Sequence, residues 1–276
     1  ETREPVKGQA DDAESLHFLA EAMRRAYADR AEHLGDPDYV DVPFEGLISK
    51  DYAKRLAATI DQKKATPSST IGAGDPYPYE STETTHFSVA DADGNMVANT
   101  YTLNASFGSG IVIPGTGVLM NNEMDDFSAA PGVPNLFGLV GGEKNAIEGG
   151  KRPLSSMTPT FVFRDGEPFM ATGAQGGALI ISTVLQTVVN VIDRGMNIGD
   201  ATDHPRIHNQ WLPDAIFYEE GLSADTLRLL EAKGHQVVPL DWHATPQTIM
   251  VGDGWFYGYT DARVPGGAAC SPDGGC

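Results

Sequence analysis

The spacing of apolar residues changes type along this chain, and this change limits the possible folds most strongly. Before residue 65 the apolar residues recur at helical spacing, and from Thr85 onward short runs alternate as they do in β-strands. Helical spacing returns at residues 180–192. Because strand groups and helices are segregated rather than strictly alternating, the pattern favours an α+β fold over a doubly wound parallel sheet.

Two helices are predicted before the change. Residues 11–30 read as an amphipathic helix that Asp11 or Asp12 can cap, and Ser49 is placed to cap a second one. The polar stretch that follows, residues 65–83, is long for a structureless connection inside a compact domain. We therefore expect it to be functional or mobile.

Later segments alternate between short strands and helices. The predicted strands are residues 86–90, 96–103, 110–120 (as further short strands), 160–163, 168–172, 215–219, 237–238, 248–251 and 255–259. The predicted helices are residues 180–192 and a segment that Ser223 caps and Gly234 ends. Two hairpins are expected, with turns at residues 91–95 and 164–167.

Composition excludes some classes of partner. The 276 residues suffice for one large domain or two small ones, and the net charge of −19 makes nucleic acid or an anionic membrane an unlikely partner. No apolar run approaches the roughly 20 residues of a membrane span. No signal peptide is visible, and since the chain begins at Glu1 we expect a fragment or a processed piece. Cys270 and Cys276 lie in a Gly/Pro-rich tail and can pair only with each other.

The junction between residues 83 and 84 can supply a nucleophile together with its own base. If the chain is cut between Glu83 and Thr84, Thr84 gains a free amino group beside its own hydroxyl. An α-amino group with a pKa of about 8 is well matched to take the proton from that hydroxyl. A Thr pair that opens a strand usually reflects only β-propensity, so Thr84-Thr85 alone assigns no function.

A wider pattern gives the junction a context. Five segments occur in order: Thr84-Thr85-His86-Phe87-Ser88, Thr100-Tyr101-Thr102-Leu103-Asn104, Asn121-Asn122-Glu123-Met124-Asp125-Asp126-Phe127, Arg152-Pro153-Leu154-Ser155-Ser156-Met157 and Gly173-Ala174-Gln175-Gly176-Gly177. Together they closely resemble the γ-glutamyltransferase family of N-terminal-nucleophile hydrolases. The resemblance implies an α+β fold of the four-layer αββα sandwich type. It also implies that residues 1–83 are the C-terminal segment of the large subunit and residues 84–276 the small, catalytic subunit.

The resemblance implies a role for each matching residue. Thr84 would be the nucleophile that cleaves the precursor after Glu83, and the Thr102 hydroxyl would hydrogen-bond it. Three side chains would bind the α-amino and α-carboxylate ends of the glutamyl group: Asn104, Glu123 and Asp126. The pair Ser155 and Ser156 would bind the substrate carboxylate. Gly176 and Gly177 would form the oxyanion hole, which suits glycines that open a helix with bare N–H groups.

The implied activity is that of a self-cleaving transferase and hydrolase. It would cleave the γ-glutamyl amide of glutathione or related compounds through a threonine ester and pass the group to water, an amino acid or a peptide. No cofactor and no metal are expected. The rest of the large subunit would be its partner after self-cleavage, and the location would be periplasmic or extracellular.

Two departures from the family stand out. The family's large subunit supplies an arginine that clamps the substrate α-carboxylate, and that part of the family's chain is absent here. Residues 131–142 resemble the bacterial lid, in which Phe137 replaces the usual tyrosine. The tyrosine hydroxyl would bond the residue that matches Asn104, so we expect this lid to close less firmly, or on packing alone.

Other interpretations stay open at this point. One is a relative that hydrolyses a glutaryl amide, as cephalosporin acylases do, although Glu123 and Asp126 suit an α-amino group instead. Another is an incomplete, non-catalytic fragment. His204 and His208 lie four apart, but the proline between them and the lack of a third ligand argue against a metal pair. Neither a G-x-S-x-G nor an H-E-x-x-H motif occurs.

Overall fold

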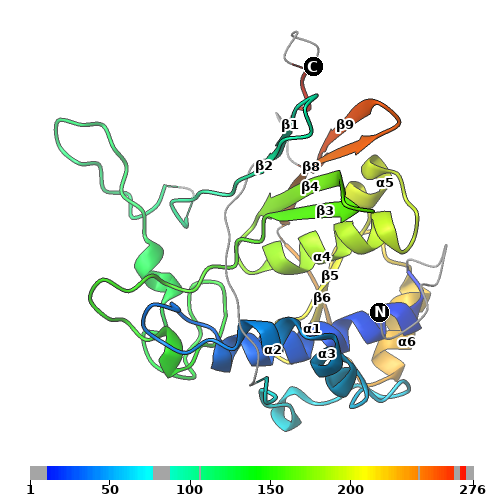
Figure 1. The fold of residues 1–276 in the computed structure, drawn as a ribbon. Helices are drawn as coiled ribbons and strands as arrows, with labels where there is room; N and C mark the ends of the chain where they lie inside the picture. Colours follow the sequence, from blue (N-terminus) through cyan, green and yellow to red (C-terminus); the bar gives the residue numbers. More distant parts are fainter. Residues whose placement is uncertain (1–10, 77–87, 106, 242, 264–267, 272–276) are drawn as a thin grey trace.

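The centre of the structure is a four-stranded antiparallel sheet. The computed structural model describes residues 11–76, 88–105, 107–241, 243–263 and 268–271 (Figure 1). The strand order is β3 (Thr160–Arg164), β4 (Glu167–Gln175), β8 (Thr245–Gly252) and β9 (Trp255–Thr260). Asp165 and Gly166 both have positive φ, 54° and 87°, as the predicted tight turn between β3 and β4 requires.

Helices and a hairpin cover the two faces of this sheet. The helices α4 (Leu179–Ile192) and α5 (Ile198–Asp203) pack on one face, and the hairpin of β1 (Ser88–Ala90) and β2 (Met96–Ala98) lies on the other (Figure 1). A buried cluster joins the sheet to the helices through Phe169, Met170, Val191 and Ala201. The chain thus builds one α layer and parts of two β layers.

A second group of elements packs beyond α4. The helices are α1 (Ala13–His33), α2 (Phe44–Ile48), α3 (Lys50–Ala57) and α6 (Ala224–Ala232), and the small sheet contains β5 (Ile207–His208), β6 (Ile216–Tyr218) and β7 (Val237–Pro239). Three single-turn 3₁₀ helices complete the described elements: Ser68–Thr70, Glu123–Asp126 and Glu143–Asn145.

Helix α1 buries the apolar stripe that its spacing predicts. Leu16, Ala20, Met23 and Tyr27 are all buried, and they belong to the largest apolar cluster, with members from β5, β6 and α6. The predicted caps are confirmed by geometry. An Asp12 carboxylate oxygen accepts the amides of residues 14 and 15, the Ser49 hydroxyl accepts that of residue 52, and the Ser223 hydroxyl accepts that of residue 226.

The segment that precedes the proposed cut is partly anchored. The Thr66 amide donates to Glu21 Oε1 at 3.0 Å, and the Gly74 amide donates to Asp29 Oδ1 at 2.8 Å. Trp211 Nε1 also donates to the carbonyl of residue 68 at 3.1 Å. Residues 65–76, part of the stretch that we expected to be functional or mobile, are therefore held against α1. Residues 77–83 lie outside the described residues.

Two strand predictions are wrong. The second strand of the first hairpin ends at Ala98, and residues 99–103 are not paired in a sheet. Residues 110–120 form only one isolated bridge, between Val112 and Leu119. They belong to an arm, residues 107–120, that projects from the body (Figure 1). Four glycines with positive φ interrupt any regular ladder there: Gly108, Gly110, Gly115 and Gly117.

The prediction also missed α2, α5 and β5, each of six residues or fewer. No helix among the described residues is both long and apolar enough to cross a bilayer. Cys270 is disulfide-bonded.

Candidate active site

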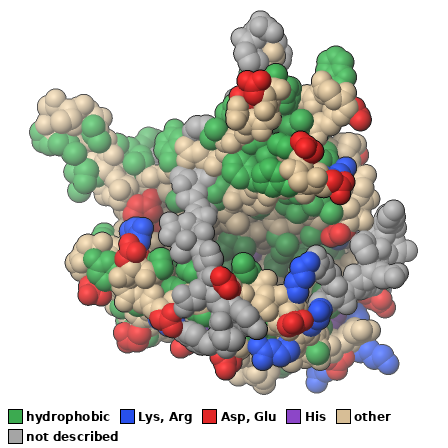
Figure 2. Space-filling view, in the orientation of Figure 1, with side chains coloured by type: hydrophobic (Ala, Val, Ile, Leu, Met, Phe, Trp, Pro, Cys, Tyr) green, Lys and Arg blue, Asp and Glu red, His purple; other side chains and the backbone are tan. Residues whose placement is uncertain are grey.

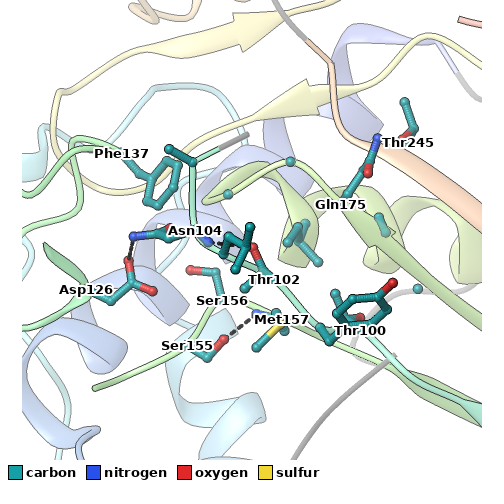
Figure 3. A pocket seen from close by; sticks show the side chains of 18 of the residues that line it. Thr100, Thr102, Asn104, Asp126, Phe137, Ser155, Ser156, Met157, Gln175 and Thr245 are labelled. Atoms are coloured by element: carbon teal, nitrogen blue, oxygen red, sulfur yellow. Dashed lines mark hydrogen bonds between the residues drawn. The ribbon is translucent and has the colours of Figure 1, made fainter. Parts of the chain in front are cut away.

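A cavity of about 1020 Å³ opens where β4 ends and α4 begins (Figure 3). Besides residues 173–177, its walls include residues 100–105, Asp126, the lid, residues 155–157, His243 and the start of β8. Figure 3 shows Asn104 and Asp126 on one side of the cavity and Gln175 and Thr245 on the other.

The turn between β4 and α4 admits only glycine. Gly176 and Gly177 have φ values of 135° and 53°. A Cβ on Gly176 would lie 2.5 Å from Ala244, and a Cβ on Gly177 would lie 2.5 Å from the ring of Phe137. Backbone N–H groups at the start of a helix attract negative charge, so this turn can stabilise an oxyanion.

Helix α1 is hydrogen-bonded to the residue that follows this turn. The Tyr27 hydroxyl donates to the carbonyl of Ala178 at 2.7 Å, and the Tyr27 side chain is buried. Burial raises the pKa of the Tyr27 hydroxyl well above its usual range, so the donor stays protonated. The glycine turn is thus fixed to an element more than 140 residues earlier in the chain.

Thr102 and Asn104 lie on a bend of the cavity wall. The Thr102 hydroxyl accepts the Asn104 amide at 2.8 Å. Asn104 has a φ of 73°, a left-handed conformation that asparagine tolerates better than most residues. Its side-chain amide donates to Asp126 Oδ1 and to the carbonyl of Asn122, each at 3.3 Å. The bend places one hydroxyl and one amide group beside a carboxylate.

Glu123 and Asp126 form a carboxyl pair on one helical turn. Their side chains share a hydrogen bond, and Asp126 lines the cavity whereas Glu123 is not among the lining residues. Burial, with the Asp126 charge as a second cause, raises the pKa of Glu123 to about 7. Burial also raises the pKa of Asp126. The pair therefore shares a proton near neutral pH, which a bound cation could displace.

An arginine that sequence analysis missed, Arg30, hydrogen-bonds both Ser155 and Ser156. Arg30 Nη2 donates to the Ser156 hydroxyl at 3.0 Å and to the Ser155 carbonyl at 3.4 Å. Arg30 follows Tyr27 by three residues, so it lies on the same face of α1, and that spacing is a signal that could have found it. Asp126 also interacts electrostatically with Arg30.

The lid is closed over the glycine turn by packing and by hydrogen bonds between side chains and the backbone. Asn135 Oδ1 accepts the amides of Phe137 and Leu139, both at 3.0 Å. Gln210 Nε2 donates to the Phe137 carbonyl at 3.3 Å. The Phe137 ring packs against the apolar cluster of α1 and lies directly over Gly177. A phenylalanine can thus close this lid without a hydroxyl.

The cavity brings together most of the residues that the sequence nominates. Those on its lining are Thr102, Asn104, Asp126, Phe137, Ser155, Ser156, Gly176 and Gly177. Glu123 touches one of them, Asp126. Glu83 and Thr84 lie outside the described residues. His243 also lines the cavity, and sequence analysis missed it because no periodic pattern marks it.

The histidines considered for a metal pair have other contacts. His204 Nε2 lies 2.7 Å from an Asp11 carboxylate oxygen, and His208 Nδ1 lies 2.8 Å from the Ser182 hydroxyl. A separate buried cluster contains His17, Glu21 and His235. Its two rings hydrogen-bond each other at 2.6 Å, and Glu21 is paired with an arginine at 2.7 Å, so these atoms already serve the protein's own contacts.

Comparison with known proteins identifies the family. The family model described as γ-glutamyltranspeptidase matches residues 4–271. The chain belongs to this family. It is 57% identical over 252 residues to a glutathione hydrolase proenzyme of Escherichia coli, which covers 91% of this chain and 43% of that protein. The chain thus spans less than half the length of such curated relatives of the family.

Solved structures agree with this assignment. A γ-glutamyltranspeptidase from Pseudomonas nitroreducens, complexed with L-DON, is 43% identical with a TM-score of 0.64, and the match covers 68% of this chain and all of that one. A cephalosporin acylase from Bacillus halodurans is 28% identical with a TM-score of 0.77, and the match covers 92% of this chain and 44% of that one. The α+β fold of the N-terminal-nucleophile hydrolase type is confirmed.

Proposed function

We propose that this chain is the catalytic part of a self-cleaving γ-glutamyl hydrolase and transferase. The observation that carries the proposal is the cavity itself. It places a glycine turn suited to an oxyanion beside a serine pair and a carboxyl pair suited to the two ends of an amino acid. Membership in the γ-glutamyltranspeptidase family supports it.

The reaction would begin with activation of the precursor. The Thr84 hydroxyl attacks the carbonyl carbon of Glu83, and the C–N bond between Glu83 and Thr84 breaks as its nitrogen takes the proton. Water then hydrolyses the resulting ester, which frees the Glu83 carboxylate and the Thr84 hydroxyl. The new α-amino group of Thr84 then serves as base and, after protonation, as acid. Residues 1–83 and 84–276 become the end of a large subunit and the small subunit, respectively.

Catalysis would follow in two acyl-transfer steps. Thr84 attacks the γ-amide of glutathione or a related compound, and the leaving amine takes the proton. The amides of Gly176 and Gly177 stabilise the oxyanion. Water, an amino acid or a peptide then attacks the γ-glutamyl ester and releases Thr84. The chemistry needs no cofactor.

The glutamyl group would be held by its two charged ends. Asp126, hydrogen-bonded to Glu123, takes the ammonium group, and Asn104 contributes its side-chain amide. Ser155 and Ser156 take the α-carboxylate, with Arg30 behind them. Because Arg30 already donates to Ser156, it orients that hydroxyl and adds positive potential on the carboxylate side.

A direct experiment tests the cleavage step. The full-length parent protein is incubated, and the N-terminal sequences of its products are read. From the wild-type protein we expect a chain that begins Thr84-Thr85-His86. We expect the Thr84→Ala protein to stay uncut after Glu83. Intact wild-type precursor would contradict self-cleavage, and cleavage of the Thr84→Ala protein would contradict the role of Thr84.

Substrate assays separate the remaining alternatives. A glutaryl group lacks the α-ammonium, so it would leave the Glu123–Asp126 pair without its cationic partner. We expect the processed enzyme to cleave a γ-glutamyl anilide much faster than a glutaryl anilide. The opposite preference would indicate an acylase of the cephalosporin type, and activity on neither would indicate a non-catalytic chain.

The partner and the location are part of the same proposal. The rest of the large subunit would complete the cavity and supply the arginine that clamps the α-carboxylate. A periplasmic or extracellular location is expected of this activity by resemblance, and fractionation of cells that express the full-length protein would test it.

A further inference from the structure

One side of the cavity carries polar groups that the glutamyl group would not use. Thr100, Gln175, His243 and Thr245 line the cavity. In Figure 3, Gln175 and Thr245 lie across the cavity from Asp126 and Asn104. A substrate whose glutamyl part occupies the Asp126 side has its leaving group, or its incoming acceptor, on this other side.

His243 presents one ring nitrogen to a buried ionic cluster. Its Nδ1 lies 3.3 Å from Glu219 Oε1. Glu219 is only 2% exposed and is paired with Arg206 at 3.0 Å and with Arg263 at 3.2 Å. Arg206 also pairs with Asp261 at 3.0 Å, so two carboxylates balance two arginines.

This contact determines what His243 offers to the cavity. A carboxylate between two arginines can only accept hydrogen bonds, so Nδ1 of His243 must be the donor. In the neutral ring, the Nε2 atom then keeps its lone pair. The His243 side chain is about one-third exposed and lines the cavity, and Nε2 makes no hydrogen bond to the described residues.

Two buried hydroxyls on the same lining have no partner. Thr100 Oγ1 and Thr245 Oγ1 are buried, and neither hydrogen-bonds to any described residue. Thr245 is only 1% exposed. A buried hydroxyl without a partner costs about 1–3 kcal/mol, so unsatisfied hydroxyls that line a cavity indicate a ligand that would satisfy them.

We propose that His243, oriented by Glu219, and the Thr100 and Thr245 hydroxyls bind the amine that leaves and the amine that enters. This inference rests on the proposed function. The ligand class is an amino acid or short peptide with a free α-amino group. Nε2 of His243 accepts a hydrogen bond from that amino group, and the two hydroxyls bond the peptide's polar backbone.

The location agrees with such a role. Ala244 follows His243 directly and touches the glycine turn, since a Cβ on Gly176 would lie 2.5 Å from it. An amine held here lies beside the carbonyl group whose oxygen the turn would stabilise. The leaving amine and the incoming amine occupy the same position because the two acyl-transfer steps are the reverse of each other.

Two substitutions of His243 isolate the atom that faces the cavity. In His243→Asn, the side-chain amide can replace Nδ1 as the donor to Glu219, while nothing replaces Nε2. In His243→Gln, the amide oxygen can reach the Nε2 position. The processed full-length enzyme is assayed with γ-glutamyl-p-nitroanilide, with and without glycylglycine, to obtain the transfer-to-hydrolysis ratio and the KM of the acceptor.

We expect His243→Asn to raise the acceptor KM and to lower the transfer-to-hydrolysis ratio, each roughly tenfold. In His243→Gln, the KM and the ratio should both lie between those of His243→Asn and wild type. Thr245→Val should change both in the same direction. Thr260→Val is the matched control, because Thr260 Oγ1 is also buried and unpartnered but does not line the cavity. A ratio unchanged in His243→Asn, or lowered equally in the Thr260 control, would overturn the inference.

A second measurement needs no turnover. Saturation-transfer NMR of glycylglycine with the processed wild-type enzyme, without donor, should show binding that His243→Asn weakens and the Thr260 control does not. Equal binding by wild type and His243→Asn would overturn the inference. An enzyme that binds glycylglycine in this way but cleaves no γ-glutamyl compound would contradict the proposed function instead.

Discussion

At the scale of single residues, contacts between distant parts of the chain decide the chemistry of the cavity. The serine pair and the glycine pair belong to short local motifs, so sequence alone could nominate them. Arg30 hydrogen-bonds Ser156, which lies 126 residues later in the chain. Glu219, which contacts His243, is itself paired with arginines from two further segments. No local sequence pattern encodes such long-range contacts, and therefore sequence analysis missed both Arg30 and His243.

The Glu123–Asp126 pair leads to a prediction about pH. The pKa of Glu123 is raised to about 7, so Glu123 is neutral below pH 7 and charged above it. A substrate ammonium binds better to two charged carboxylates than to one. The KM of a γ-glutamyl donor should therefore fall as the pH rises from about 6 to about 8.

Glu123→Gln supplies the comparison, because glutamine cannot titrate. The charged groups that face Glu123 and Asp126, namely Asp125 and Arg30, are unchanged in this variant. Its donor KM should depend much less on pH over the same range, while the pH dependence of kcat, which includes the Thr84 amine, persists. Identical KM profiles for the two proteins would contradict the role of Glu123.

At the scale of elements, prediction succeeded where the pattern is long and failed where packing decides. The apolar period of α1 and α4 and the β3–β4 hairpin are strong local signals, and all three are confirmed. The elements α5 and β5 are too short to show a period, and tertiary contacts hold them. The arm at residues 107–120 alternates like a strand, yet its glycines prevent a regular ladder.

The lid supports a prediction at this scale. Phe137 covers Gly177 and packs on the main apolar cluster, whereas its neighbour Leu136 is 59% exposed. Phe137→Ala removes that packing and should open the lid. Hydrogen exchange of the residue 135–139 amides should become faster by about tenfold or more, and the donor KM should rise.

Leu136→Ala is the matched control for the lid. It shortens an exposed side chain of the same segment, and the hydrogen bond from its amide to Asp125 at 2.7 Å can remain. Exchange in the lid should then stay within about twofold of wild type. If Phe137→Ala exchanged no faster than this control, the lid would not depend on the ring.

At the scale of the whole molecule, the surface carries more exposed apolar side chains than its function alone explains. Figure 2 shows them on the projecting arm and over the strands. The exposed apolar residues of the arm are Phe107, Ile111, Val112, Ile113, Val118 and Met120. Since the chain spans 43% of its Escherichia coli relative, the rest of a large subunit is the partner that we expect to cover such a surface.

This expectation can be tested by changing the arm and leaving the cavity intact. Phe107 and Ile111 are 76% and 62% exposed, so changing both to Ser removes apolar surface without removing a core contact. In the isolated chain, the double substitution should reduce self-association, measured by size-exclusion chromatography. When the chain is co-expressed with the rest of the large subunit, the same change should weaken co-purification, because burial of each side chain contributes about 1.5–3 kcal/mol.

Leu229→Ser, at a position 56% exposed on α6, is the control, and it should alter neither self-association nor co-purification. Co-purification of the arm variant at the wild-type level would show that the partner does not cover the arm.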